Sequence, residues 1–250
     1  MPGNALSAPA QQSESSTKLA IIVALSAERS ALSDVSCGDL DCIIIQSGPG
    51  AANAARAAEE ALRDGATALL SVGIAGALSE ELVAGSVLVP RYLIDAETPQ
   101  ITLQTAETWS GELRALLAPD FHVSDGTLLG VAGVIGEPAA RRAARQEYQA
   151  VACDMESAAM AHVAARAKVK FAAIRVISDQ AKDTLPAGVD AWVDSDGNST
   201  ILPLLFALLA PSQWLSFIVM VRRFRIAHTT LGRVCRMLRD VGYCCSRTSL

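Results

Sequence analysis

Short apolar runs alternate with alanine-rich stretches along most of the chain. The apolar runs predict β-strands at residues 19–25, 41–46, 68–72, 86–90, 127–134, 150–153 and 171–177. The stretches between them predict helices at residues 27–32, 51–64, 110–117, 137–147 and 155–167. Strands that alternate with helices indicate a sheet covered by helices. The pattern therefore predicts an α/β fold, a three-layer α/β/α sandwich with a central mixed, mostly parallel sheet.

The two ends of the chain depart from this alternation. Residues 1–17 are rich in Ser, Gln, Ala and Pro without apolar periodicity, which predicts a disordered tail. Residues 197–221 carry no charge, a stretch long enough to span a bilayer, but prolines at 203 and 211 break it into two short helices. We therefore favour packing on the sheet over membrane insertion for its first half. The predicted division is a tail at 1–17, one domain at 18–210, and a C-terminal helix and tail at 211–250.

The C-terminal segment differs in charge from the rest of the protein. From residue 212 to the end there are seven arginines and one acid, a charge of +6, which leaves −11 for the remainder of a chain whose net charge is −5. Apolar residues recur at helical spacing through residues 214–240, flanked by these arginines. Such an amphipathic helix is typical of a peripheral contact with an anionic membrane surface. Nucleic-acid binding by the whole protein is not expected.

The amino-acid composition indicates which broad class of protein this is. Apolar residues make up 51% of the 250 positions and aromatic residues 4%, which suits one globular domain with a large core. The six cysteines show no spacing typical of metal ligands, and no secretory signal precedes them. We expect reduced thiols, a cytoplasmic location and no metal site.

Two carboxylates stand where α/β proteins place their chemistry. Glu156 opens the helix predicted after the strand at 150–153, where the positive end of a helix dipole favours an anion that can accept hydrogen bonds from sugar hydroxyls. Asp179 follows the apolar strand at 171–177, and polar residues at the carboxyl end of such a strand often form the active site. Considered alone, Asp179 is somewhat better explained as a helix N-cap.

These segments resemble the purine nucleoside phosphorylase and nucleosidase superfamily, and within it the 5′-methylthioadenosine/S-adenosylhomocysteine nucleosidases. The resemblance covers residues 19–186. Four segments carry it in the family's order: Ile21–Glu28, Ser71–Ala77, Asp154–Ala159 and Arg175–Asp179. The glycine turn Gln46–Gly50, leading into an alanine-rich helix, is a further match.

The resemblance implies the fold predicted above and a role for each matching residue. Asp179, helped by Ser178, is implied to protonate N7 of a departing purine, and Glu28 to activate a water molecule. Met155 and Glu156 are implied to hold the ribose. The strand end with Ala75 and Gly76 is implied to approach base and ribose. Relatives are commonly homo-oligomers, which makes a homo-oligomer the expectation here.

Water and phosphate remain alternative nucleophiles. Related phosphorylases hold phosphate with an arginine and a serine on the strand that here reads Ser71-Val72-Gly73-Ile74. Neither Ser71 nor Ile74 can replace an arginine clamp, although Arg29 is a candidate phosphate ligand. Hydrolysis without a cofactor is favoured, with phosphate as co-substrate if the enzyme is a phosphorylase. A nucleoside-binding module without turnover is the alternative of another class.

The residues after Asp179, at 180–186, and the arginine-rich last helix resemble the hopanoid-associated branch of the superfamily. Members of that branch are thought to remove adenine from adenosylhopane, a lipid with a 5′-linked adenosine. The resemblance implies a small-molecule nucleoside as the substrate, lipid-linked in this branch. A peripheral position on the inner face of the membrane, through residues 214–240, fits such a substrate.

Overall fold

A computed structural model describes residues 18–32, 42–185, 196–197 and 214–240. Its strands are β1 (Leu19–Val23), β2 (Cys42–Gln46), β3 (Ala68–Ala77), β4 (Val87–Leu88), β5 (Tyr92–Asp95), β6 (Thr102–Gln104), β7 (Val123–Ser124), β8 (Leu128–Gly130), β9 (Ala152–Asp154) and β10 (Lys170–Asp179). Its helices are α1 (Ser26–Ala31), α2 (Ala51–Arg63), α3 (Glu107–Leu117), α4 (Pro138–Tyr148), α5 (Ser157–Ala167) and α7 (Trp214–Asp240).

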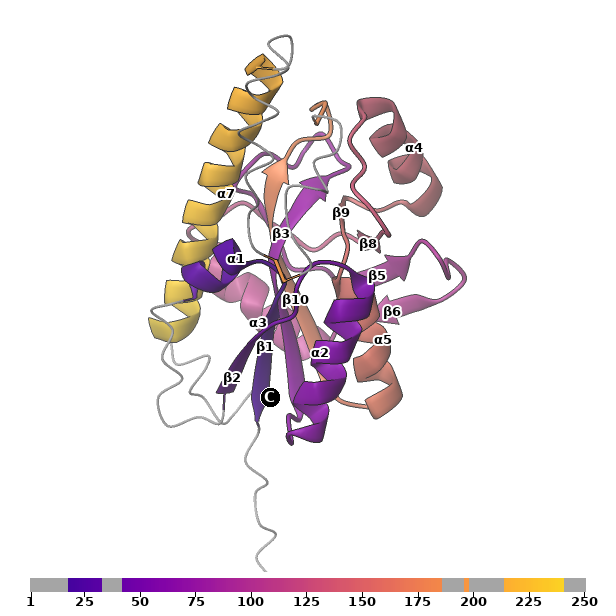
Figure 1. The fold of residues 1–250 in the computed structure, drawn as a ribbon, viewed down its shortest axis with the longest axis vertical. Helices are drawn as coiled ribbons and strands as arrows, with labels where there is room; N and C mark the ends of the chain where they lie inside the picture. The colour runs from indigo at the N-terminus through magenta and orange to yellow at the C-terminus, as the bar shows by residue number, and fades with distance from the viewer. Residues whose placement is uncertain (1–17, 33–41, 186–195, 198–213, 241–250) are drawn as a thin grey trace, which may run out of the picture.

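The ten described strands form one sheet, at whose centre β3 and β10 run in parallel (Figure 1). On one side β3 pairs with β1, which pairs with β2, and both pairings are parallel. Beyond its middle β3 pairs antiparallel with β9, and the sheet continues through β8, β5 and β6. Six of the nine strand pairs are parallel. The predicted mixed, mostly parallel sheet is confirmed.

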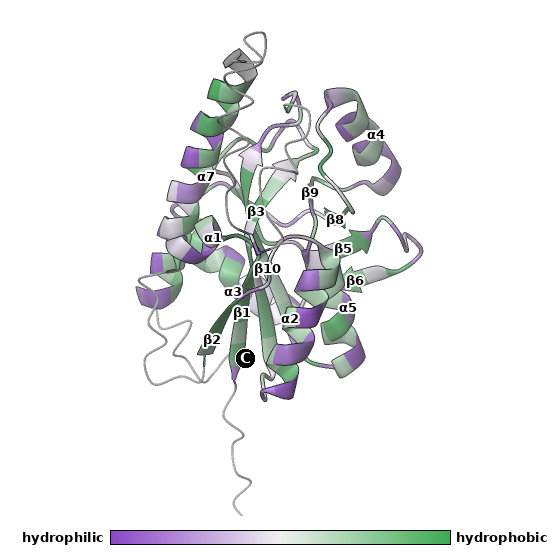
Figure 2. Cartoon of the chain, viewed as in Figure 1, coloured by the Kyte–Doolittle hydropathy of each residue, from purple (hydrophilic) through white to green (hydrophobic). Residues whose placement is uncertain are grey.

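Helices cover both faces of the sheet and complete the three predicted layers. Helices α2 and α5 pack against one face through alanines and short apolar side chains, which allow close approach. Helices α1, α3 and α7 cover the other face, where Trp109 of α3 is buried. Figure 2 shows the apolar central strands in green and the mixed surfaces of the covering helices. The core therefore consists of two large apolar clusters separated by the sheet, with a third, smaller cluster between α4 and strands β8 and β9.

The sequence pattern predicted seven of the ten described strands, including the short strands β4, β8 and β9 that lie within longer apolar runs, and missed β5, β6 and β7. Strands β5, β6 and β7 have at most four residues each, too few for a periodic pattern to stand out. Strands β3 and β10 are longer than predicted, because both continue through the polar and glycine residues at their ends instead of turning there. This extension brings the polar strand ends together.

Helix α7 has an inner and an outer side. On the inner side Ala227, Leu231, Val234 and Leu238 are buried against the sheet, so this half of the predicted amphipathic stripe belongs to the domain core. In the first half of the helix, Ile218 and Val221 are exposed. Within the described ranges, no helix is long and apolar enough to cross a membrane. The predicted tail at 1–17, the helix predicted within 197–210 and the boundary at 210 lie outside the described residues.

Candidate active site

Glu28 is held at the centre of the molecule by backbone donors from two elements. It lies in the first turn of α1, and its Oε2 accepts hydrogen bonds from the N–H groups of Ala24 and Leu25, each at 2.9 Å. Its Oε1 accepts a third, from the N–H of Ile74 on β3, at 2.9 Å. Only 4% of Glu28 is exposed. The carboxylate is therefore fixed in one position against the middle of the sheet.

Gly73 makes room for this carboxylate. A Cβ atom at position 73 would lie 2.6 Å from Oε1 of Glu28 and 3.3 Å from Nη1 of Arg175. Real Cβ atoms do not approach other atoms so closely, so any larger residue would displace one of the two charged groups. The glycine in the Ser71–Ala77 segment is thus required by the site and not by a turn, because it lies inside β3.

Glu156 stands at the N-termini of two helices. It is the N-cap residue of α5, as its position in the sequence predicts. Its Oε1 accepts a hydrogen bond at 2.9 Å from the N–H of Gly50, which is the N-cap residue of α2. Gly50 has a φ of 91°, a conformation that side chains rarely adopt. The predicted ribose ligands, Glu156 and the neighbouring Met155, are both half-buried.

A buried ion pair between Arg175 and Asp154, to which the sequence analysis gave no role, lies close to both glutamates. Nε of Arg175 on β10 donates to Oδ2 of Asp154 at 2.6 Å, and Nη2 donates to Oγ of Ser71 at 2.7 Å. Nη1 of Arg175 donates to the carbonyl of Ile174 at 3.2 Å. Ser157 donates its hydroxyl to Oδ2 of Asp154 at 2.5 Å. All three nitrogens of the guanidinium group are engaged by this network.

These groups act on one another electrostatically. The pKa of Glu156 is raised to about 7, chiefly by burial and then by the charge of Asp154, while Arg175 and the N–H of Gly50 oppose the shift. Burial likewise raises the pKa of Glu28, against Arg175 and the backbone donors. Burial alone would lower the pKa of Arg175, but the nearby carboxylates outweigh it and raise it. The cluster therefore holds three carboxyl groups around one guanidinium.

Asp179 forms a second group with different partners at the end of the same strands. It pairs with Gly76 of β3, where a Cβ atom would lie 2.9 Å from its Oδ2. Ser178 donates its hydroxyl to Oδ1 of Asp179 at 2.6 Å and also lies 3.3 Å from the carbonyl oxygen of Ala75. These are the four residues predicted for this part of the site. Nη2 of Arg141 lies 2.5 Å from Oδ2 of Asp179.

The two groups lie apart along β3. Gly73 and Gly76 are three positions apart, roughly 10 Å along the strand, and face opposite sides because side chains alternate. Glu28 lies against the first glycine and Asp179 against the second. The structure thus brings Glu28 and Glu156 together, and Asp179 with Ser178 beside Arg141.

Arg141 is the residue of this site that the sequence did not reveal. It lies on α4 with 1% of its surface exposed. Besides Asp179, it donates to the carbonyl groups of Ile135, Ala77 and Gln180 at 2.8, 3.3 and 2.9 Å. It therefore ties together three segments that surround Asp179. An arginine in an alanine- and arginine-rich helix is ordinarily exposed, so the pattern gave no indication of this role.

The positions at which a phosphate would be held are otherwise occupied. Ser71 is fully buried and accepts from Arg175, and Ile74 uses its backbone to hold Glu28. Arg29 is exposed and donates to the carbonyl of Ile44 at 3.0 Å. Within the part of the chain that the structure describes, no group of three or more His, Cys, Asp or Glu residues could hold a metal ion.

The chain is similar to one known protein family and to several solved structures. The family described as "Phosphorylase superfamily" matches residues 19–202. Among solved structures, the fold is similar to futalosine hydrolase of Helicobacter pylori, with a TM-score of 0.69, 15% identity, and coverage of 90% of this chain and 98% of that chain. It is also similar to the 5′-methylthioadenosine/S-adenosylhomocysteine nucleosidase of Campylobacter jejuni, with a TM-score of 0.66, 20% identity, and coverage of 88% and 98%. No curated protein matches the sequence.

Proposed function

The chain belongs to the phosphorylase superfamily, and on this premise we propose that it hydrolyses the N-glycosidic bond of a 5′-substituted adenosine and releases adenine. Membership confirms the expectation of an enzyme of the nucleosidase and nucleoside phosphorylase class. The observation that carries the finer proposal is the cluster of Glu28, Asp154 and Glu156 around Arg175. Three carboxyl groups facing one guanidinium favour a sugar that becomes positively charged when its bond to the base breaks.

In the proposed reaction the C1′–N9 bond breaks and its electrons pass to the purine, which takes a proton at N7 from Asp179. A water oxygen bonds to C1′, and Glu28 accepts the proton that the water loses. Burial raises the pKa of Glu28 and so makes its carboxylate a stronger base. Glu156, ionised, accepts hydrogen bonds from the ribose hydroxyls while Met155 packs against the sugar. The products are adenine and a sugar with a 1′ hydroxyl.

Asp179 must change partners in this scheme. A guanidinium at 2.5 Å stabilises the negative charge of a carboxylate, whereas a general acid must carry a proton. We propose that Arg141 holds Asp179 in the empty enzyme. When a nucleoside binds, Asp179 turns from Arg141 to the purine and takes up from solvent the proton that it then donates to N7.

Hydrolysis is favoured over phosphorolysis by the arginines of the site. A phosphate dianion is bound by guanidinium and hydroxyl groups that are free to face it. The nitrogens of Arg175 are engaged by Asp154, Ser71 and Ile174, and Arg29 donates to β2. Phosphate as a co-substrate is therefore the second candidate.

A lipid-linked adenosine such as adenosylhopane is our finer proposal for the substrate. It is supported by the resemblance of residues 180–186 and of the last helix to the hopanoid-associated branch. With this substrate we also propose that the protein lies in the cytoplasm at the inner face of the membrane. We further propose that it assembles as a homo-oligomer, as is common among relatives. A water-soluble 5′-substituted adenosine fits the same catalytic residues.

Adenine release from 5′-methylthioadenosine, and from an adenosine with a long apolar 5′ group, tests the reaction with and without phosphate. We expect release without phosphate and a preference for the apolar substrate. Release only with phosphate, yielding a ribose 1-phosphate, would establish a phosphorylase.

Replacing the proposed general acid tests its role separately. Asp179→Asn should lower kcat by roughly 10²–10⁴-fold, while binding of the nucleoside, followed by calorimetry, persists. Asp64→Asn, which changes an exposed carboxylate at the end of α2, outside the proposed mechanism, is the control. Unchanged turnover in Asp179→Asn would exclude Asp179 as the acid.

A further inference from the structure

The outer side of α7 is an apolar and basic surface that the catalytic site does not use. Ile218, Val221 and Ile226 are 60%, 37% and 41% exposed. They are three of the seven large apolar side chains exposed among the described residues. Their concentration on one helix distinguishes this face, because apolar residues scattered singly on a surface are ordinary.

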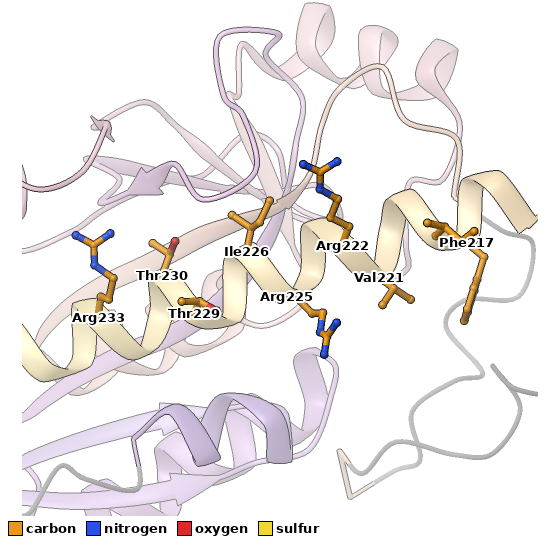
Figure 3. A pocket seen from close by; sticks show the side chains of 9 residues that line it. Phe217, Val221, Arg222, Arg225, Ile226, Thr229, Thr230 and Arg233 are labelled. Atoms are coloured by element: carbon orange, nitrogen blue, oxygen red, sulfur yellow. The ribbon is translucent and has the colours of Figure 1, made fainter.

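These side chains line a groove with arginines on both sides. The groove has a volume of about 560 Å³ and is lined by residues of α7. Figure 3 shows Ile226 on the same side of the helix as Arg222, and Val221 on the side of Arg225. Thus each exposed aliphatic side chain labelled there has a guanidinium group nearby.

The charge on α7 is positive up to its last residue, Asp240. From residue 214 to residue 239 the helix contains six arginines and no acidic residue. Arg223 forms an ion pair with Asp183, and Arg233 lies over the ring of Phe121, 4.8 Å from its centre. Arg222, Arg225 and Arg236 are exposed, and no carboxylate of the described residues pairs with them. These three cations are positioned to bind an external anion.

We propose that this outer face of α7 (Ile218, Val221, Arg222, Arg225 and Ile226) docks the protein reversibly on a lipid bilayer with anionic headgroups. Guanidinium groups bind phosphate oxygens in pairs, and the aliphatic side chains between them enter the boundary between headgroups and acyl chains. A nucleic acid would satisfy the arginines but leave the three aliphatic side chains in water. The combination therefore fits a phospholipid surface better than a purely polar polyanion.

The face lies close to the catalytic strands. Helix α7 packs on β10, which ends at Asp179, and Arg223 of the same helix holds Asp183 in the turn that follows. Docking through α7 would therefore hold this strand end beside the membrane. Docking on the membrane does not depend on the proposed reaction. Only the further idea that docking delivers a lipid-linked nucleoside to the site rests on the proposed function.

Sedimentation of the full chain with vesicles tests the surface. We expect binding to vesicles of phosphatidylcholine mixed with phosphatidylglycerol, little binding to phosphatidylcholine alone, and weakening by salt. The pair Arg222→Gln and Arg225→Gln should weaken binding roughly thirtyfold, at about 1 kcal/mol for each arginine. The pair Ile218→Ser and Val221→Ser should weaken it as well. The matched control, Arg56→Gln with Arg63→Gln on the exposed side of α2, removes the same charge and should bind like the unaltered protein.

Each variant is also assayed for thermal unfolding and for adenine release from water-soluble 5′-methylthioadenosine, which should stay unchanged. Vesicle binding is scored on its own, so an inactive enzyme that still docks would refute the proposed reaction but not the surface. Equal binding by α7 variants and the α2 control would overturn the docking proposal. So would a change in oligomeric state, or in binding to RNA, in the α7 variants while vesicle binding persists.

Discussion

At the residue scale, Glu156 links pH to both stability and binding. Its pKa is raised from 4.5 to about 7, chiefly by burial. A carboxyl whose pKa is higher in the folded state contributes stability that is complete below about pH 4.5 and is lost as pH rises through about 7. Ionised Glu156 is the better acceptor for ribose hydroxyls, so binding should improve over the same range.

Replacing this carboxyl with an amide should therefore separate the two effects. Glu156→Gln keeps an acceptor for the N–H of Gly50 but cannot ionise. We expect the variant to unfold at a higher temperature than the unaltered protein above neutral pH, with the difference disappearing in acid, and to bind nucleosides more weakly. Thermal unfolding against pH measures this, with Glu59→Gln on the surface of α2 as control. A pH-independent difference would contradict the assignment.

Arg141 should be coupled energetically to Asp179. Removing one partner of a buried ion pair leaves an uncompensated charge, which costs about 3–5 kcal/mol. Arg141→Met also leaves the carbonyls of Ile135 and Gln180 without their donor. We expect a loss of stability of that order, reduced when Asp179→Asn is combined with it. Urea unfolding of the two single variants and the double variant measures the coupling, and Arg142→Met on the exposed side of α4 should be near neutral. Additive effects would show that the pair is not coupled.

The residues of the site differ in how far the sequence reveals them. Glu28 and Glu156 were identified because each lies in a short segment that resembles a family motif, and the structure places them together. Arg141 was not, because it meets Asp179 only through the packing of α4 against the strand ends. The sequence likewise did not identify Asp154 as the ion-pair partner of Arg175, because the pairing of β9 with β3 brings the two residues together. Contacts between distant segments depend on topology, which local patterns do not encode.

At the element scale, the prediction was right for the described helices and for seven of the ten described strands. The alternation of apolar runs and alanine-rich stretches identified helices α1 to α5 and the long strands. The sequence only partly predicted which side of α7 packs on the sheet and which is exposed, because both sides carry apolar residues. Leu231 and Leu238 face the sheet, whereas Ile218 faces outward. Burial, and not hydrophobicity, separates the two roles.

This separation predicts different costs for two truncations on one helix. Leu231 is 1% exposed and lies in the core, so Leu231→Ala should cost about 2–5 kcal/mol of unfolding free energy. Ile218→Ala, at a position 60% exposed, should cost less than about 0.5 kcal/mol. Urea unfolding followed by circular dichroism and by loss of activity measures both. If Leu231→Ala melted α7 while the enzyme stayed active, the helix would be an appendage rather than part of the catalytic domain.

At the scale of the whole molecule, the sheet joins an anionic site to a cationic surface. The pairing of β3 with β10 and of β3 with β9 gathers Glu28, Asp154 and Glu156 around Arg175. Helix α7, with its arginines, packs on one face of the same sheet. The acidic body and the basic helix identified in the sequence are thus packed against each other. The site should attract a cation, and the outer face of α7 an anion.

The anionic site predicts a preference for positively charged analogues of the substrate. With Glu28, Asp154 and Glu156 ionised, one guanidinium leaves an excess of two negative charges beside the sugar. A 5′-methylthioadenosine analogue whose ribose is replaced by a protonated pyrrolidine should therefore bind at least about tenfold more tightly than its neutral cyclopentane counterpart at about pH 8.

The advantage should shrink below about pH 6, as Glu156 takes up a proton. It should also be smaller at every pH in Glu156→Gln, which removes one of the charges. Calorimetric titration of both analogues against pH measures the difference directly, without relying on turnover. Equal affinities for the charged and the neutral ring would mean that the carboxyl cluster does not stabilise a cationic sugar. The proposed hydrolysis would then lose its main electrostatic support, and an anionic co-substrate such as phosphate would no longer face an unfavourable field.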